Sequence, residues 1–547
     1  MNRILKTIAL CVLSAPALHA APPALQYSAE FVGATSTGDF APYMLAAGRN
    51  GLLSRKNTAL LDVAASKALD ESRRFSWGAG VELAAGYSSA TAYERYDAAT
   101  ATWGTHSQRP AALYVQQLYA TAKYRRVFLT VGQKSPRSYL SDDLTAAGDF
   151  VRSSNARGIP GFEAGFLDFV DIPLTKGWVQ IDGVLAYGKF TDDSFRRGQF
   201  NYYNDILATG LYYTYKRCHL RTNPSKPFNV TVGVQGAGQF GGRTVRYERG
   251  HITKDEDRGF RFKDAWDMML PVHNGGEGWF TGNSLGSFDV MLRYRFRDDS
   301  EIKAYLQNPW EDGSGMAKLN GWDGIWGISY RRPGRHALMS ATIEYLDFTN
   351  ESGHMHWAPG DYPGTTITNR ATGADDYYNN DVYGAYANNG MAIGTPFLMA
   401  PVYNRDGVPF FAHNMARGVH AGAAGAIGDD IDWRAAFSYQ KAWGQGRVPQ
   451  AHPLHNTSFM AEAVWRADRL LPGLRLTAQL GMDCGSLRGD TFGALIGIRY
   501  GGNLFAFSAG KTVVKNLCVD GTTQLFGFSN IPRTSSCCAV NEDKTEI

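Results

Sequence analysis

The clearest structural signal in the chain lies in residues 289–307, which read DVMLRYRFR-DDS-EIKAYLQ. Apolar residues such as Val290 alternate with polar residues such as Arg293, and this is the period of a β-strand. The polar triplet DDS suits a tight turn, and the alternation resumes from Glu301 onward. The stretch therefore predicts an antiparallel hairpin with one apolar and one polar face.

The polar face of this hairpin indicates its surroundings. A dry core would not tolerate a row of arginines, whereas the water-filled lumen of a transmembrane barrel would. The residues that we place in the lumen are Arg293, Arg295 and Arg297. They would either attract anionic sugars or pair across the hairpin with Glu301 and its neighbours, and we favour the pairing.

Comparable alternation recurs along the chain, for example in Phe228–Gln235. The predicted fold is therefore all-β, a transmembrane antiparallel β-barrel of about 16–18 strands. Long polar insertions at 244–287 and 350–391 contrast with short connections elsewhere, as expected for loops on one rim and turns on the other. Ala- and Leu-rich runs at 43–48 and 58–67 predict a short helical insert near the N-terminus.

Composition and the first residues narrow the class of protein further. The 547 residues carry a net charge of +4 with no block of like charge, so we expect no nucleic-acid partner. Residues 1–20 combine early basic residues, an apolar stretch and small residues, which predicts a cleaved signal peptide. Beyond them no apolar run is long enough for a membrane-spanning helix. We expect the barrel at 21–512 and a C-terminal strand or polar extension at 513–547, in the outer membrane of a Gram-negative bacterium.

Several blocks of sequence resemble one known family. The longest block is Tyr305–Gly315, which reads YLQNPWEDGSG, and Asp323–Gly327 follows it. The other blocks are Gly132–Lys134, Asn155–Pro160, Ile172–Gln180, Gln239–Gly242, Gly282–Gly286, Glu344-Tyr345, Ser352–His354, Asp376–Asn380 and Ile393–Phe397. In this order and spacing, the blocks resemble the outer-membrane capsule assembly proteins of the Wzi type, in the form found in Bacteroides-like bacteria.

The resemblance implies a lectin that binds exported capsular or surface polysaccharide and attaches it to the cell surface, without enzymatic turnover. We also expect contacts with outer-membrane lipid and with the barrel insertion machinery, and a monomer without a cofactor. Barrels of the family tend to end on an aromatic residue, whereas this chain ends in the polar segment Asn541–Ile547. The last strand is therefore expected upstream, near Leu504–Ala509 or Gln524–Phe528, or else the tail is an extension.

Polysaccharide binding needs aromatic faces for sugar CH groups and polar side chains for hydroxyls, and two loops offer both. The candidates in the first loop are Gln307, Asn308, Trp310, Glu311, Asp312, Trp322 and Asp323. The candidates in the 350–391 insertion, which we expect to face outward, are His354, Trp357, Asp376, Tyr377 and Tyr378. The alternative is a structural role: acidic side chains cap backbone amides in the first loop, and the second packs on itself.

Two other kinds of site are not expected. His354 and His356 lack a third ligand in local spacing, so we predict no metal. Adjacent carboxylates such as Glu311 and Asp312 usually point apart, and the chain has none of the common hydrolase or nucleotide-binding motifs, so we predict no catalytic residue. The alternative function is a porin-like channel for oligosaccharides or other small solutes, which would require an open lumen.

Overall fold

The structure is a computed structural model that describes residues 25–269, 282–311, 313–316, 318–351, 375–446 and 448–504. The predicted signal peptide and the segment 513–547 lie outside these residues, as do the candidates Asp312, His354 and Trp357. Within the described part of the chain, no helix has both the length and the apolar character that a bilayer crossing would need.

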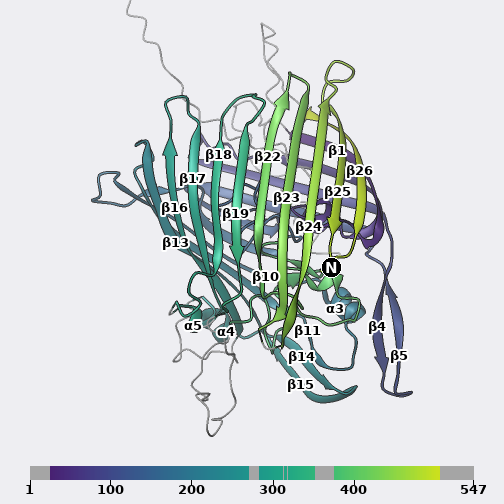
Figure 1. The fold of residues 1–547 in the computed structure, drawn as a ribbon. Helices are drawn as coiled ribbons and strands as arrows, with labels where there is room; N and C mark the ends of the chain where they lie inside the picture. Colours follow the sequence, from purple (N-terminus) through teal and green to yellow (C-terminus); the bar gives the residue numbers. More distant parts are fainter. Residues whose placement is uncertain are drawn as a thin grey trace, which may run out of the picture.

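A closed antiparallel β-barrel of 18 strands forms the body of the protein (Figure 1), which confirms the predicted fold class. Its wall consists of β1 (Leu25–Phe40), β2 (Arg55–Lys67), β3 (Phe75–Ser88), β6 (Leu113–Tyr124), β7 (Val127–Gln133), β8 (Gly161–Phe166), β9 (Val170–Asp171), β10 (Val179–Lys189), β12 (Tyr212–Thr222), β13 (Phe228–Phe240), β16 (Gly282–Arg295), β17 (Glu301–Trp310), β18 (Gly324–Arg331), β19 (Ser340–Asp347), β22 (Ala416–Ile427), β23 (Ile431–Gln445), β24 (Val448–Arg466), β25 (Leu474–Cys484) and β26 (Thr491–Leu504).

Wall strands pair with their neighbours in chain order, and β1 closes the circle. Glu30 of β1 lies opposite Asp62 of β2 on one side and opposite Arg499 of β26 on the other. β8 and β9 both pair with β10 and are two pieces of one wall strand. Because β26 closes the barrel, the closing strand lies upstream of the polar C-terminal segment.

Side chains along the wall alternate between an apolar outer face and a polar inner face. In β16, Val290 and Leu292 are 40% and 41% exposed, whereas Asp289 between β13 and β17 is 2% exposed. Arg295 lies opposite Glu301, which confirms the hairpin predicted for 289–307. The apolar outer band is what a barrel presents to lipid.

The two rims differ in their connections. Where β1 begins, short turns such as 125–126 and 296–300 join the strands, and the opposite rim carries the long connections. These hold α2 (Tyr43–Ala46), β4 (Thr91–Asp97), β5 (Thr102–Gln108), α3 (Asp193–Gln199), β11 (Asp205–Thr209), β14 (Gly242–Glu248), β15 (His251–Gly259), α4 (Phe262–Asp267), α5 (Gly313–Met316), β20 (Ala387–Asn388), β21 (Met391–Ala392) and η2 (Pro401–Tyr403). The hairpins β4–β5 and β14–β15 extend below the barrel in Figure 1. In outer-membrane barrels such a rim faces the cell exterior.

Two segments from this long-loop rim fill the lumen, and we call residues 134–160 and 375–414 the plug. Phe150 and Tyr378, one from each segment, are fully buried and stack with ring centroids 4.9 Å apart. The plug is bonded to the wall, because the backbone N–H of Ala147 donates to Glu344 of β19 at 2.6 Å. The interior of the barrel is thus a packed core.

Two sequence predictions need correction. The helical insert is confirmed only as α2, because 58–67 belongs to β2. Its Ala and Leu residues favour a helix intrinsically, but Leu61 faces outward at 49% exposure while Leu60 is 3% exposed, and pairing on both edges fixes a strand. The prediction that 350–391 faces outward is wrong for residues 375–391, which lie in the plug.

Candidate functional site

The candidates Gln307 and Asn308 lie in β17, toward the long-loop rim, and they hold nearby loops in place. Gln307 is fully buried; its side-chain amide donates to Asp149 at 2.7 Å, and its carbonyl oxygen accepts the backbone N–H of Phe150 at 2.7 Å. Asn308 donates to the backbone carbonyl of Asp323 at 2.7 Å. Both side chains therefore hold loops in place, and neither is presented to solvent.

Trp310 and Glu311 continue this anchoring. Trp310 is 2% exposed and its ring lies directly against Gly286 of β16, where a side chain would collide with it. The carboxylate of Glu311 accepts the backbone N–H of Tyr378, and the backbone N–H of Glu311 donates to Asp375 at 3.3 Å. The acidic residue thus bonds backbone amides, as the structural alternative proposed.

Asp323 joins the two candidate loops. It accepts hydrogen bonds from the hydroxyl of Tyr377 at 2.9 Å and from the backbone N–H groups of Asn350 and Glu351 at 3.1 and 2.9 Å. Burial raises the pKa of Asp323 to about 6. The structure therefore brings the predicted residues of both loops together, but as a buried network between wall and plug.

Asp376 and Tyr378 belong to the same network. Asp376 accepts a hydrogen bond from Asn379 at 3.0 Å, and the Tyr378 hydroxyl accepts the backbone N–H of Thr395 at 3.0 Å while donating to the carbonyl of Phe150. The ring of Tyr378 is fully buried and cannot stack on an external sugar, and the carboxylate of Asp376 bonds other side chains of the plug.

Trp322 is the one polysaccharide-binding candidate among the described residues with a largely exposed side chain, at 80%. Its ring lies 5.8 Å from that of Trp326, which shares the outer face of the wall with Tyr345 opposite it. Aromatic residues at this height form the interfacial girdle of membrane barrels, so Trp322 fits a lipid contact better than a sugar contact.

The predicted lumen arginines divide into two groups. Arg293 pairs with Glu301 at 3.7 Å, and Lys303 pairs with the same carboxylate at 3.5 Å, which is the cross-hairpin pairing that we favoured. Arg295 lies on the same inward row of β16. Arg297 falls in the exposed turn after β16, so its placement in the lumen is wrong.

A cavity of about 330 Å³ opens at the long-loop rim, and sequence reasoning missed it. We call it the rim cavity. It is bounded by the segments 38–43, 399–405 and 487–491 together with Asp483. The segment 38–43 runs from the end of β1 to the start of α2, and the segment 487–491 leads from β25 into β26. The segment 399–405 is part of the plug. No local motif marks it, because its lining converges from positions more than 400 residues apart.

Aromatic and charged side chains line the rim cavity. The guanidinium carbon of Arg488 lies 4.4 Å from the ring centre of Tyr43 and 5.7 Å from that of Tyr403. Tyr403 in turn meets Phe40 edge to face at 5.1 Å. At the mouth, Arg405 pairs with Asp39 at 2.5 Å, and both side chains are more than half exposed. Such a lining suits polyhydroxylated ligands.

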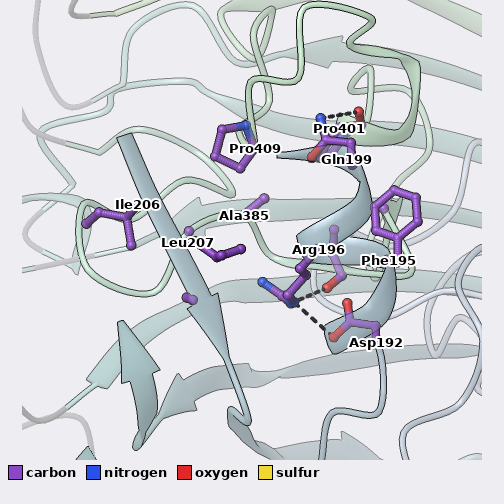
Figure 2. A pocket seen from close by; sticks show the side chains of 13 residues that line it. Asp192, Phe195, Arg196, Gln199, Ile206, Leu207, Ala385, Pro401 and Pro409 are labelled. Atoms are coloured by element: carbon purple, nitrogen blue, oxygen red, sulfur yellow. Dashed lines mark hydrogen bonds and ion pairs between the residues drawn. The ribbon is translucent and has the colours of Figure 1, made fainter. Parts of the chain in front are cut away.

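Two other features lie at this end of the molecule. Figure 2 shows a second cavity, beside the Arg196–Asp192 ion pair of α3, but its volume of about 30 Å³ has room only for water. Tyr96, Trp103 and Tyr203 form a cluster at the hairpin β4–β5, with ring centroids 4.8 to 5.4 Å apart. Trp103 is 48% exposed, so this cluster is a second aromatic surface.

Fold and loops together define a β-barrel of the outer-membrane type with a filled lumen. No family model matches the chain, and no curated protein matches its sequence.

Among solved structures, the barrel is similar to Wzi of Escherichia coli, described as an outer-membrane protein involved in group 1 capsule assembly and a carbohydrate-binding β-barrel. That similarity has a TM-score of 0.53 at 11% identity, over 91% of this chain and 86% of that chain. It establishes the fold. OccAB2 of Acinetobacter baumannii follows at a TM-score of 0.43 and 11% identity, over 88% and 98% of the chains. OprD of Pseudomonas aeruginosa has a TM-score of 0.40 at 9% identity, over 88% and 93%.

Proposed function

We propose that this protein is an outer-membrane barrel of a Gram-negative bacterium that binds exported capsular or surface polysaccharide and attaches it to the cell surface. The filled lumen is the observation that carries the proposal. Phe150, Tyr378 and Phe397 are fully buried inside the barrel, and Gln440 of β23 donates to the carbonyl of Phe397 at 2.8 Å. In a barrel with a filled lumen and a wall surrounded by lipid, the surface that a ligand outside the cell can reach lies at the rim.

The long-loop rim supports binding of a polymer outside the cell. It carries the rim cavity, where the ring faces of Phe40 and Tyr403 lie beside polar groups. The wall meets outer-membrane lipid, and the barrel insertion machinery would place it there. We propose a monomer without enzymatic activity, in keeping with the sequence resemblance to Wzi-type proteins.

The alternative function, a porin-like channel, is less well supported. A solute path would have to cross the plug, where Gln307 and Glu344 hold loop backbone against the wall and Asp323 accepts the hydroxyl of Tyr377. Opening that path would leave buried donors and acceptors without partners, and each such loss destabilises by about 1–3 kcal/mol.

Two measurements on one preparation separate these functions. The purified full-length protein is inserted into planar bilayers for conductance, and its binding to polysaccharide isolated from the producing strain is measured by biolayer interferometry. We expect saturable binding and no steady conductance. Steady conductance without binding would refute attachment and support the channel.

A further inference from the structure

The rim cavity has the dimensions of a ligand site. Its volume of about 330 Å³ lies within the range of about 300–1,000 Å³ that is typical of small-molecule sites. It lies at the rim that faces outward in barrels of this kind. Part of its floor is the plug, through Met399 and Tyr403, so the same packing that closes the lumen also shapes the cavity.

Two tyrosine hydroxyls in this lining are free to bind a ligand. Neither Tyr43, at 5% exposure, nor Tyr403 makes a hydrogen bond through its hydroxyl to any described residue. Burial raises the pKa of Tyr403 to about 12, so its hydroxyl stays protonated and can donate at neutral pH. Tyr403 is half-buried, and because neither hydroxyl is engaged by the described part of the protein, both can donate to or accept from a polar ligand in the cavity.

The charges of the lining argue against an acidic ligand. Three carboxylates, those of Asp39, Asp483 and Asp490, face two guanidinium groups, those of Arg405 and Arg488. Arg405 is paired with Asp39, so its charge is already balanced. The lining has no excess of positive charge to attract a carboxylate or phosphate.

The remaining contacts of Arg488 and Asp483 fix the floor of the cavity. Arg488 reaches the backbone carbonyls of Pro396 and Phe397 at 3.4 and 3.3 Å while its Nε has no partner among the described residues. Asp483 accepts the backbone N–H of Tyr43 at 2.7 Å and the hydroxyl of Ser458. Both side chains are held by the fold before any ligand arrives, which lowers the entropy lost on binding.

We infer that the rim cavity is a subsite for an uncharged sugar residue of the bound polysaccharide. The ring would lie against Tyr403 and Phe40, and its hydroxyls would bond the free tyrosine hydroxyls and the Asp39–Arg405 pair. This inference rests on the proposed function, since it names the sugar class and the place on the barrel where the polymer is held.

The test uses the full-length protein in detergent and one polysaccharide in two forms. The polymer is purified from the producing strain, and half of it is treated so that every carboxyl group is reduced to an alcohol. Tyr403→Phe removes one hydroxyl and keeps the ring contact with Phe40, and Asp39→Ala removes the acceptor at the mouth. Trp103→Ala, in the hairpin β4–β5, is the matched control at the same rim. Unheated detergent gels confirm that each variant is folded.

We expect reduction of the carboxyl groups to leave the affinity of the wild-type protein unchanged or higher. Tyr403→Phe should weaken binding about 2- to 10-fold and Asp39→Ala about tenfold or more, with Trp103→Ala close to wild type. The inference is overturned if both cavity variants bind like wild type, or if reduction abolishes binding. If the wild-type protein binds neither form, the proposed function itself fails.

Discussion

Removing the carboxylate of Asp149 should loosen the plug while leaving the barrel wall intact. This fully buried side chain accepts the backbone N–H groups of Tyr139, Leu140 and Ser141 at 2.6, 2.9 and 3.0 Å, and the amide of Gln307 at 2.7 Å. It therefore ties one turn of the plug together and ties that turn to β17. None of these bonds belongs to the ladder between wall strands.

The magnitude follows from the donors that Asp149→Ala leaves behind. The N–H groups of Tyr139 and Ser141 are partly accessible and can bond water, whereas those of Leu140 and Gln307 are buried. Two buried donors without partners destabilise the seated plug by about 2–6 kcal/mol. The population of unseated plug should then rise by roughly 30-fold to 10⁴-fold.

Hydrogen exchange followed by mass spectrometry reads this out directly in peptides that cover 138–151. Asp149→Ala should exchange faster there, with transient conductance in planar bilayers, and Asp149→Asn should fall between it and wild type. Asp171→Ala is the matched control, because Asp171 is exposed near the short-turn rim and, among the described residues, its side chain bonds only Gln180, at 2.8 Å. Unchanged exchange in Asp149→Ala would refute the anchoring role.

Three further outcomes are expected. The pKa of Asp323 is raised to about 6 from 3.8, so the folded state binds the proton of this carboxyl more readily than the unfolded state, and the resulting stabilisation is present in acid and lost as pH rises through 6. The backbone amides of residues 350–351 should therefore exchange more slowly at pH 5 than at pH 7.5 after correction for intrinsic rates. Asp323→Asn should flatten this difference. Ile343→Arg places a charge on the outer face of the wall, at a position that is 68% exposed. It should reduce the free energy of unfolding in bilayers by about 2–4 kcal/mol, measured by urea titration, while Ile343→Leu should be near neutral. Trp322→Ala should leave the affinity for the strain's polysaccharide unchanged, because that ring packs beside the outward Trp326, and a tenfold loss would show that it contacts sugar.

The wall was predictable because its signal is local. Strict alternation in 289–307 reports which side chains meet lipid, and the register of Arg295 opposite Glu301 follows from the turn between them. The segment 58–67 misled the prediction because its alternation is hidden: Leu60 and Leu61 are both apolar although one faces inward and the other outward.

The plug and the rim cavity depend on contacts that no local pattern records. Tyr377 reads as an exposed loop aromatic until its hydroxyl is seen to bond Asp323, 54 positions earlier. The rim cavity needs Tyr43 and Arg488 side by side, although they lie at opposite ends of the described chain. Only closure of the barrel, with β1 paired to β26, brings those two segments together.

The most direct test of polysaccharide attachment is the fraction of surface polysaccharide that stays on cells when the gene is deleted, with total production measured alongside. We predict that the deletion strain produces as much polymer as its parent but sheds most of it into the medium. Complementation with the wild-type gene should restore retention of the polymer on the cells. Complementation with Trp103→Ala should restore retention, and complementation with the double variant Asp39→Ala, Tyr403→Phe should restore it poorly. Equal retention in the deletion strain and its parent would contradict attachment as the function of this barrel.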